Sequence, residues 1–205
     1  MRRKSHLGLV LIAGLIPWLL AGCSTSKVVT RTDPDAQIDL SGNWNDSDSR
    51  QMAGALVDDM LNGTAWLETH MERAGSRPAV IVGEIKNRTD EHIPMKTLVA
   101  DLEKSFINSG RVKLVASAEE REGVREERAD QQQFSSPESM KRWGRELGAD
   151  YMLLGELNTI PDREGDVSLK YYQLDCYLVN LEDNTKVWVG DDRIKKVVSR
   201  GKYKP

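Results

Sequence analysis

Short apolar strands alternate with helical segments between residues 79 and 157, and this alternation limits the possible folds more than any other feature of the sequence. The β-branched run 79–85 follows a proline and is typical of a buried strand. A helical pattern over 93–109 ends at Gly110, a residue suited to capping it. Residues 112–115 and 151–157 indicate two more strands. Strands that alternate with helices favour a layered α/β fold, with two or three layers.

Further helices are predicted around these strands. Apolar residues recur at helical spacing from Ser49 to about Leu67, with Asp48 or Ser49 as the N-cap and Gly63 as a weak point. The charged stretch 117–133 predicts a solvated helix. A last helix is expected from Ser136 to residue 148, because serine followed by proline is a common helix start.

The C-terminal third predicts an antiparallel hairpin. Residues 167–181 and 185–198 show mixed alternation, and the polar residues 182–184 between them suit a turn. An antiparallel hairpin added to parallel strands makes the sheet mixed. We therefore expect an α/β fold in a domain at 49–205: a compact mixed β-sheet flanked by helices, with a C-terminal antiparallel hairpin.

The N-terminus has the features of an export signal. A basic start precedes an apolar run of about 14 residues, which is too short to span a bilayer as a helix. Leu20-Ala21-Gly22-Cys23 resembles the bacterial lipobox, which predicts a signal peptide at 1–22 and lipidation of Cys23. Ser24 resembles the default signal for sorting to the outer membrane. Residues 23–48 then form a lipid-anchored polar tether and a loop leading into the domain.

Charge argues against nucleic-acid binding, and cysteine content argues against a stabilising disulfide. Removing residues 1–22 takes away three positive charges, so the formal net charge moves from −3 to −6. An acidic chain without a basic block argues against nucleic-acid binding. Cys176 has no intramolecular partner once Cys23 carries lipid, so stability must come from a packed core and not from a disulfide.

The sequence shows no catalytic or metal-binding constellation. His70 and His92 are too far apart for a local metal motif, and no zinc-protease, nucleophile-elbow or phosphate-cradling pattern is present. Gly83 and Gly155 lie within strands, where glycine favours close packing. Cys176 is predicted to be a buried, inert thiol. We therefore expect no cofactor, no metal, no small-molecule substrate and no enzymatic activity.

Five residues are candidates for binding a protein partner: Trp44, Arg88, His92, Tyr171 and Trp188. Arg88 and His92 follow the first strand, where α/β folds commonly place ligand groups. The aromatic residues cannot all face one core, because neighbouring strand residues point to opposite faces. Exposed aromatic side chains beside arginine are typical of interfaces. The alternatives are that residues 87–92 only form a turn and cap, and that the aromatic residues are packed in the core.

Several stretches together resemble the LpoB-type lipoproteins. They are residues 41–48, 82–93, 101–110 and 148–151 and the strand around Val187-Trp188. The resemblance implies a small mixed α/β domain and a non-catalytic outer-membrane lipoprotein at the periplasmic face. Such a protein binds a bifunctional class A penicillin-binding protein and stimulates peptidoglycan synthesis.

The chain departs from this family in the length of its tether. The best-known members carry a long proline-rich tether, whereas about 25 residues separate Cys23 from Asp48 here, a span of at most about 90 Å. A second interpretation is an envelope assembly or secretion lipoprotein of the curli-export type, although the long alternating hairpins of a membrane barrel are missing. An independent enzyme is a third interpretation, and the missing catalytic constellation argues against it.

Overall fold

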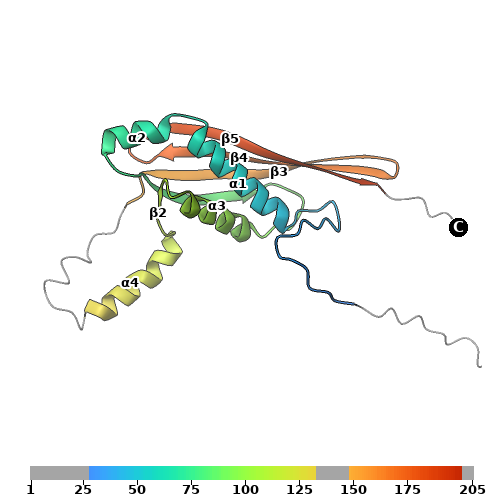
Figure 1. Ribbon diagram of the computed structural model, residues 1–205, viewed down its shortest axis with the longest axis horizontal. Coiled ribbons are helices and arrows are strands. Elements are labelled where there is room, and N and C mark those ends of the chain that lie inside the picture. Colours follow the sequence, from blue (N-terminus) through green and yellow to red (C-terminus); the bar gives the residue numbers. More distant parts are fainter. Residues whose placement is uncertain (1–27, 133–147, 200–205) are drawn as a thin grey trace, which may run out of the picture. The chain divides into compact units, whose positions relative to one another are not determined.

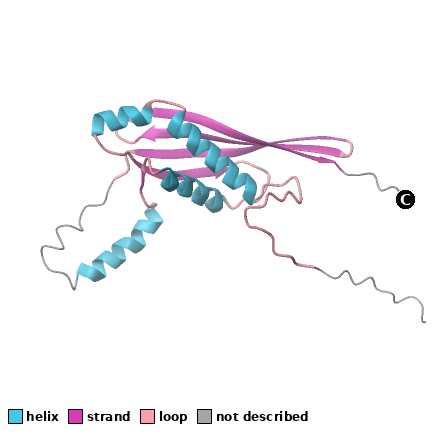
Figure 2. Ribbon diagram, in the orientation of Figure 1, coloured by secondary structure: helices cyan, strands magenta, loops and turns pink. Residues whose placement is uncertain are grey.

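The computed structural model describes residues 28–132 and 148–199, and the residues from Asp35 onward form one compact unit. The expected signal peptide, Cys23 and the helix expected at 136–148 lie outside the described residues. The elements, in chain order, are α1 (Asp46–Asn62), α2 (Trp66–Ala74), β1 (Ala79–Asn87), α3 (Met95–Ser109), β2 (Lys113–Leu114), α4 (Ala118–Gln132), β3 (Tyr151–Glu164), β4 (Val167–Asn180) and β5 (Lys186–Ser199) (Figures 1 and 2).

The five described strands form one mixed sheet in the order β2-β1-β3-β4-β5. β1 pairs in parallel with β2 and with β3, whereas β3, β4 and β5 form an antiparallel meander. Helix α3 supplies the crossover between the parallel strands β1 and β2, as parallel pairing requires. This arrangement confirms the predicted mixed sheet with a C-terminal antiparallel hairpin.

Helices α1 and α3 pack against each other and against one face of the sheet, which makes two layers (Figure 1). Leu98, Leu102 and Phe106 recur at helical spacing and are almost fully buried. Strand residues that alternate along β3 and β4, such as Leu153 and Leu174, meet them from the sheet. The core therefore lies between the helices and one sheet face.

The predicted N-cap of the first helix, Asp48 or Ser49, is wrong, because α1 begins after Asn45, whereas the predicted end of α3 at Gly110 is confirmed. Asn45 is the N-cap of α1, where its side chain accepts from the Asp48 backbone N–H and Asp48 accepts from the Asn45 N–H. Helix α3 ends at Gly110, whose φ of 63° suits glycine. Ser49 joins the two helices by donating to Asp101 at 2.6 Å.

Two predicted elements differ from the structure. The helix expected over 49–67 is two helices, because α1 ends at Asn62 with Gly63 as its C-cap and α2 begins at Trp66. Trp66 and Leu67 are buried in the core. The strand expected at 151–157 continues to Glu164 and joins β4 through a tight turn at Gly165, where φ is 56°. The antiparallel part is therefore a three-stranded meander with a long hairpin at β3–β4.

Glycine and cysteine in the sheet have the packing roles that the sequence predicts. A Cβ on Gly155 would lie 2.5 Å from both the Asp175 carbonyl oxygen and the Cys176 Sγ, so only glycine fits there. Cys176 is 1% exposed, and burial raises the pKa of its thiol to about 12. The thiol is therefore protonated and inert at neutral pH.

Candidate partner-binding surface

The sheet face opposite the helices carries the exposed side chains of the meander; we call it the open face. Along β4, Tyr172, Leu174, Cys176 and Leu178 are buried, whereas the residues between them are only partly covered. Since side chains alternate across a strand, the partly covered residues lie on the open face. Three elements, β3, β4 and β5, therefore present one continuous surface.

The far end of the meander carries an apolar group on this face, which we call the arm patch: Ile160, Val167, Leu169, Tyr171 and Val197. Register places Ile160 opposite Tyr171, and Leu169 opposite Val197. Ile160 and Val197 are 61% and 63% exposed. Contiguous exposed apolar side chains, unlike scattered ones, mark binding surfaces. The arm patch is therefore the strongest candidate for a contact with a partner.

Basic side chains lie on the same open face as the arm patch. The Lys195 Nζ lies 5.6 Å from the centre of the Tyr171 ring, within reach of a cation–π contact. Arg193 is paired with Asp191 on the same strand. Arg88 reaches the open face from the end of β1, with its Nε 3.5 Å from the Glu156 carboxylate. A partner surface with apolar and acidic groups fits this combination.

The middle of the open face is a polar band whose groups satisfy one another. Glu156, Asp175 and Asp191 face each other across three strands. Asp175 accepts hydrogen bonds from Gln173 at 2.6 Å and from Asn158 at 3.2 Å. Among the described residues there is no group of three or more acidic, histidine or cysteine side chains that could hold a metal ion.

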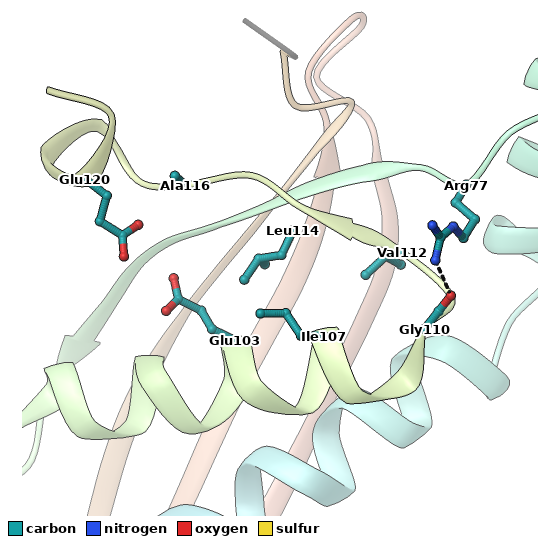
Figure 3. Close-up of a pocket in the computed structure, with 8 residues that line it drawn as sticks. All are labelled: Arg77, Glu103, Ile107, Gly110, Val112, Leu114, Ala116 and Glu120. Atoms are coloured by element: carbon teal, nitrogen blue, oxygen red, sulfur yellow. Dashed lines mark hydrogen bonds between the residues drawn. The ribbon is translucent and has the colours of Figure 1, made fainter. Parts of the chain in front are cut away.

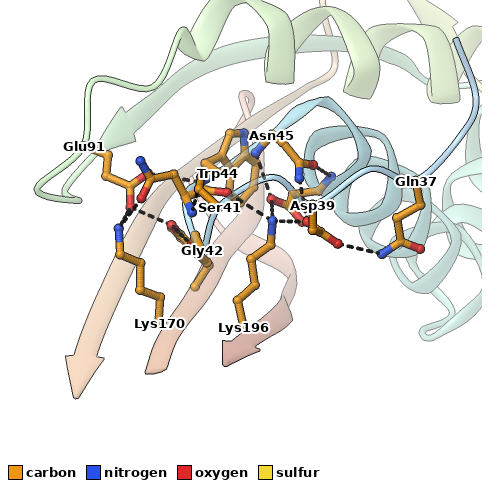
Figure 4. Close-up of polar contacts among 12 residues, drawn as sticks. Gln37, Asp39, Ser41, Gly42, Trp44, Asn45, Glu91, Lys170 and Lys196 are labelled. Atoms are coloured by element: carbon orange, nitrogen blue, oxygen red, sulfur yellow. Dashed lines mark hydrogen bonds and ion pairs between the residues drawn. The ribbon is translucent and has the colours of Figure 1, made fainter. Parts of the chain in front are cut away.

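The part of the meander that carries the arm patch, residues 158–173 and 193–199, is the arm. The loop at 37–45 that leads into α1 covers its inner face, opposite the arm patch (Figure 4). Lys196, with a side chain only 10% exposed, pairs with Asp39 at 2.8 Å and with Asp48 at 2.6 Å and donates to the Asn43 carbonyl oxygen. Although burial opposes it, these carboxylate contacts raise the pKa of Lys196. The loop is thereby fixed to β5 by a charged and largely buried group.

A second cluster joins this loop to the segment between β1 and α3. The Glu91 carboxylate accepts from the Trp44 backbone N–H at 3.1 Å, from the Tyr172 hydroxyl at 2.6 Å and from Lys170. Burial alone would raise the pKa of Glu91, but these hydrogen bonds hold it below its usual value. The Trp44 ring packs edge-on against Tyr172, with ring centres 5.4 Å apart. The loop therefore covers the inner face of the arm and leaves its open face uncovered.

The five residues that the sequence predicts to bind a partner lie in different environments. Tyr171 and Arg88 share the open face, and His92 is exposed beside the Glu91 cluster. Trp44 is half-buried against Tyr172. Trp188 is 3% exposed, and its indole N–H donates to Asp59 at 3.1 Å, so its side chain belongs to the core and is not available to a partner.

Sequence reasoning misses Ile160, Val167 and Val197 of the arm patch. Their strands carry polar residues on both sides near the hairpin, which hides the alternation. The available signal is Gly165-Asp166 between two alternating stretches, a pair suited to a hairpin turn.

None of the described helices is long and apolar enough to cross a membrane.

Comparison with known proteins identifies the family. The sequence model of one family, the peptidoglycan-synthase activator LpoB, matches residues 48–194, which is more than half of the chain. No curated protein matches the chain.

Among solved structures, the NMR structure of Escherichia coli LpoB matches with 16% identity and a TM-score of 0.41, covering 97% of this chain and 96% of that one. The LpoB C-terminal domain from Salmonella enterica matches with 19% identity, a TM-score of 0.39 and coverage of 72% and 98%. Lipoprotein GNA1162 from Neisseria meningitidis matches with 13% identity, a TM-score of 0.41 and coverage of 62% and 88%. On the family match, the chain belongs to the LpoB family of peptidoglycan-synthase activators.

Proposed function

We propose that this LpoB-family protein docks on its class A penicillin-binding protein through the arm patch and the basic residues beside it. The family consists of activators and not of enzymes, so catalysis belongs to the synthase. The observation that carries the proposal is the contiguous apolar surface of Ile160, Tyr171 and Val197 on an otherwise charged domain. Such a surface stabilises a complex when it is removed from water.

The arrangement of the arm supports a preformed docking site. Its inner face is fixed by the Lys196 and Glu91 clusters, so the strands that carry the patch are held in place before binding. A preorganised surface loses less conformational entropy on association. Stimulation then follows if the arm binds the active conformation of the synthase more tightly than the inactive one, which shifts the synthase population toward activity.

The contact region is tested by amide hydrogen exchange on the full chain, alone and bound to a class A synthase. Exchange should slow in β4 and β5 around Tyr171 and Val197 and stay unchanged in α1 and α3. Residues 186–190, at the other end of β5, serve as an internal reference on the same strand. Slowing confined to α4, or to the loop around His92, would contradict docking through the arm patch.

We further propose that Cys23 anchors the protein by its lipid to the periplasmic face of the outer membrane. The support is the lipobox at residues 20–23, Ser24 after it, and membership in a lipoprotein family. The loop is fixed to the domain from Gln37 onward, so about 13 residues separate it from Cys23. Those residues span at most about 45 Å, which limits the distance between the membrane surface and the domain. The synthase must therefore reach the domain within that distance of the outer membrane.

Changing Cys23→Ser should remove the protein from the outer-membrane fraction, because the residue that carries the lipid is lost. Fractionation on a density gradient, with the wild-type chain in parallel, measures the change. Cys176→Ser is the matched control and should leave the protein in the outer-membrane fraction. Recovery of the Cys23→Ser protein in the outer-membrane fraction, or of the wild type in the inner-membrane fraction, would contradict the anchor.

A further inference from the structure

A groove of about 530 Å³ lies at the β2 edge of the sheet, between β2, α3 and the start of α4 (Figure 3). The groove and the arm patch are far apart on the sheet. The groove lies at the edge strand β2, whereas the arm patch lies on β3, β4 and the opposite edge strand β5. Ile107 and Glu103 line it from α3, and Val112, Leu114 and Glu120 from the other side. The docking proposed above does not use this groove.

The outer backbone edge of β2 is unpaired among the described residues. Lys113 and Val115 donate their N–H groups to Pro78 and Val80, so the backbone groups of these residues face β1. The N–H and C=O of Leu114, between them, point away from β1, as in any parallel strand pair. No described strand pairs with β2 on the side away from β1. The edge can therefore accept one more strand.

The side chains at the groove are apolar on the floor and acidic at one end. Ile107 is 62% exposed, whereas Val112 is buried and Leu114 is half-buried. Glu103 and Glu120 point toward each other across the groove (Figure 3). Neither carboxylate has a cationic partner among the described residues. Burial, and then the charge of Glu120, raise the pKa of Glu103.

We infer that this groove binds an extended peptide of a partner protein, added as a strand to the outer edge of β2 and carrying a lysine or arginine two residues from an apolar side chain. The spacing follows from geometry. Glu103 and Ile107 are four residues apart on α3, a rise of about 6 Å. Residues i and i+2 of a strand lie about 6.6 Å apart on one face. One side chain can therefore meet Ile107 while the next on that face pairs with Glu103 and Glu120.

The test is a selection of random nine-residue displayed peptides on the immobilised full chain, followed by affinity measurements with the enriched peptides. The peptides should carry the apolar and basic pair at positions i and i+2. Glu103→Lys should weaken their binding at least about tenfold, since a hydrogen bond to a charged group contributes about 1.5–3 kcal/mol. Ile107→Lys, at an exposed position, should weaken it similarly.

Glu119→Lys is the matched control, because Glu119 lies next to Glu120 but does not line the groove and pairs with Lys96 instead. It changes the net charge equally and should alter affinity less than about twofold. Thermal unfolding of each variant verifies that it is folded. Equal weakening by Glu119→Lys, unchanged binding in Ile107→Lys, or no peptide enriched over a blank surface would each overturn the inference. These results are independent of synthase binding through the arm patch.

Discussion

Trp188→Ala should lower the free energy of unfolding by about 3–5 kcal/mol, the largest stability effect that we expect from a single change. Trp188 is 3% exposed in the core, and a Cβ on Gly190 would lie 2.3 Å from its ring. Truncation leaves a cavity and also removes the hydrogen bond to Asp59. Urea unfolding of the full chain, followed by circular dichroism, gives the difference.

Val189→Ala is the matched control, because Val189 is the next residue on β5 and is 68% exposed. Its effect should stay within about 0.5 kcal/mol. Equal losses in the two variants would show that residue 188 is not packed as described. A stable Trp188→Ala protein that fails to bind the synthase would instead make Trp188 an interface residue.

The double change Ile160→Thr with Val197→Thr should weaken binding to a class A synthase by about tenfold or more. Each side chain contributes about 1.5–3 kcal/mol when fully buried, and threonine keeps the β-branched shape while it adds a hydroxyl group. Both residues are more than 60% exposed in the free protein, so the stability of the fold should change little. Surface-immobilised synthase and the full chain give the dissociation constants.

The control carries the same kind of change outside the arm patch, at Val189→Thr with Val124→Thr. Val189 lies at the other end of the open face and Val124 in α4, and both are exposed. This variant should bind as the wild type does. If both double variants bind with unchanged affinity, the arm patch is not the docking site. If both weaken equally, general surface hydrophobicity explains the effect.

Periodicity predicts the elements whose burial is regular. The alternation around Leu153 and the helical spacing of Leu98, Leu102 and Phe106 each reflect one face packed on the core. The family resemblance supplies the function, because the side chains alone indicate no chemistry. Periodicity and the family resemblance both predict a mixed α/β domain. The sheet order confirms the fold, and the family match confirms the family.

The arm escapes prediction because tertiary pairing overrides local sequence there. Beyond Leu157, β3 pairs with no described strand on the β1 side, so Pro161 is tolerated at this edge and charged residues follow it. Pairing with β4 continues to Glu164 regardless. The local composition after Leu157 indicates a loop, whereas backbone pairing with β4 makes this segment a strand.

Alternation also cannot say which face of a strand the helices cover. Tyr171 and Tyr172 necessarily point to opposite sides. The helices cover the face of β4 that carries Leu174 and Leu178, and the loop at 37–45, fixed by Lys196 and Glu91, extends this cover over Tyr172. Trp188 is buried for the related reason that α1 packs on β5. The candidate site therefore depends on contacts between residues far apart in the sequence.

Docking and activation are tested together by glycan-strand synthesis with a class A synthase, measured with the full wild-type chain and with the Ile160→Thr, Val197→Thr variant. The wild type should accelerate synthesis, the arm-patch variant should lose most of this stimulation at equal concentration, and the Val189→Thr, Val124→Thr control should retain it. Full stimulation by the folded arm-patch variant would contradict docking through the arm, and no stimulation by the wild type would contradict the activity itself.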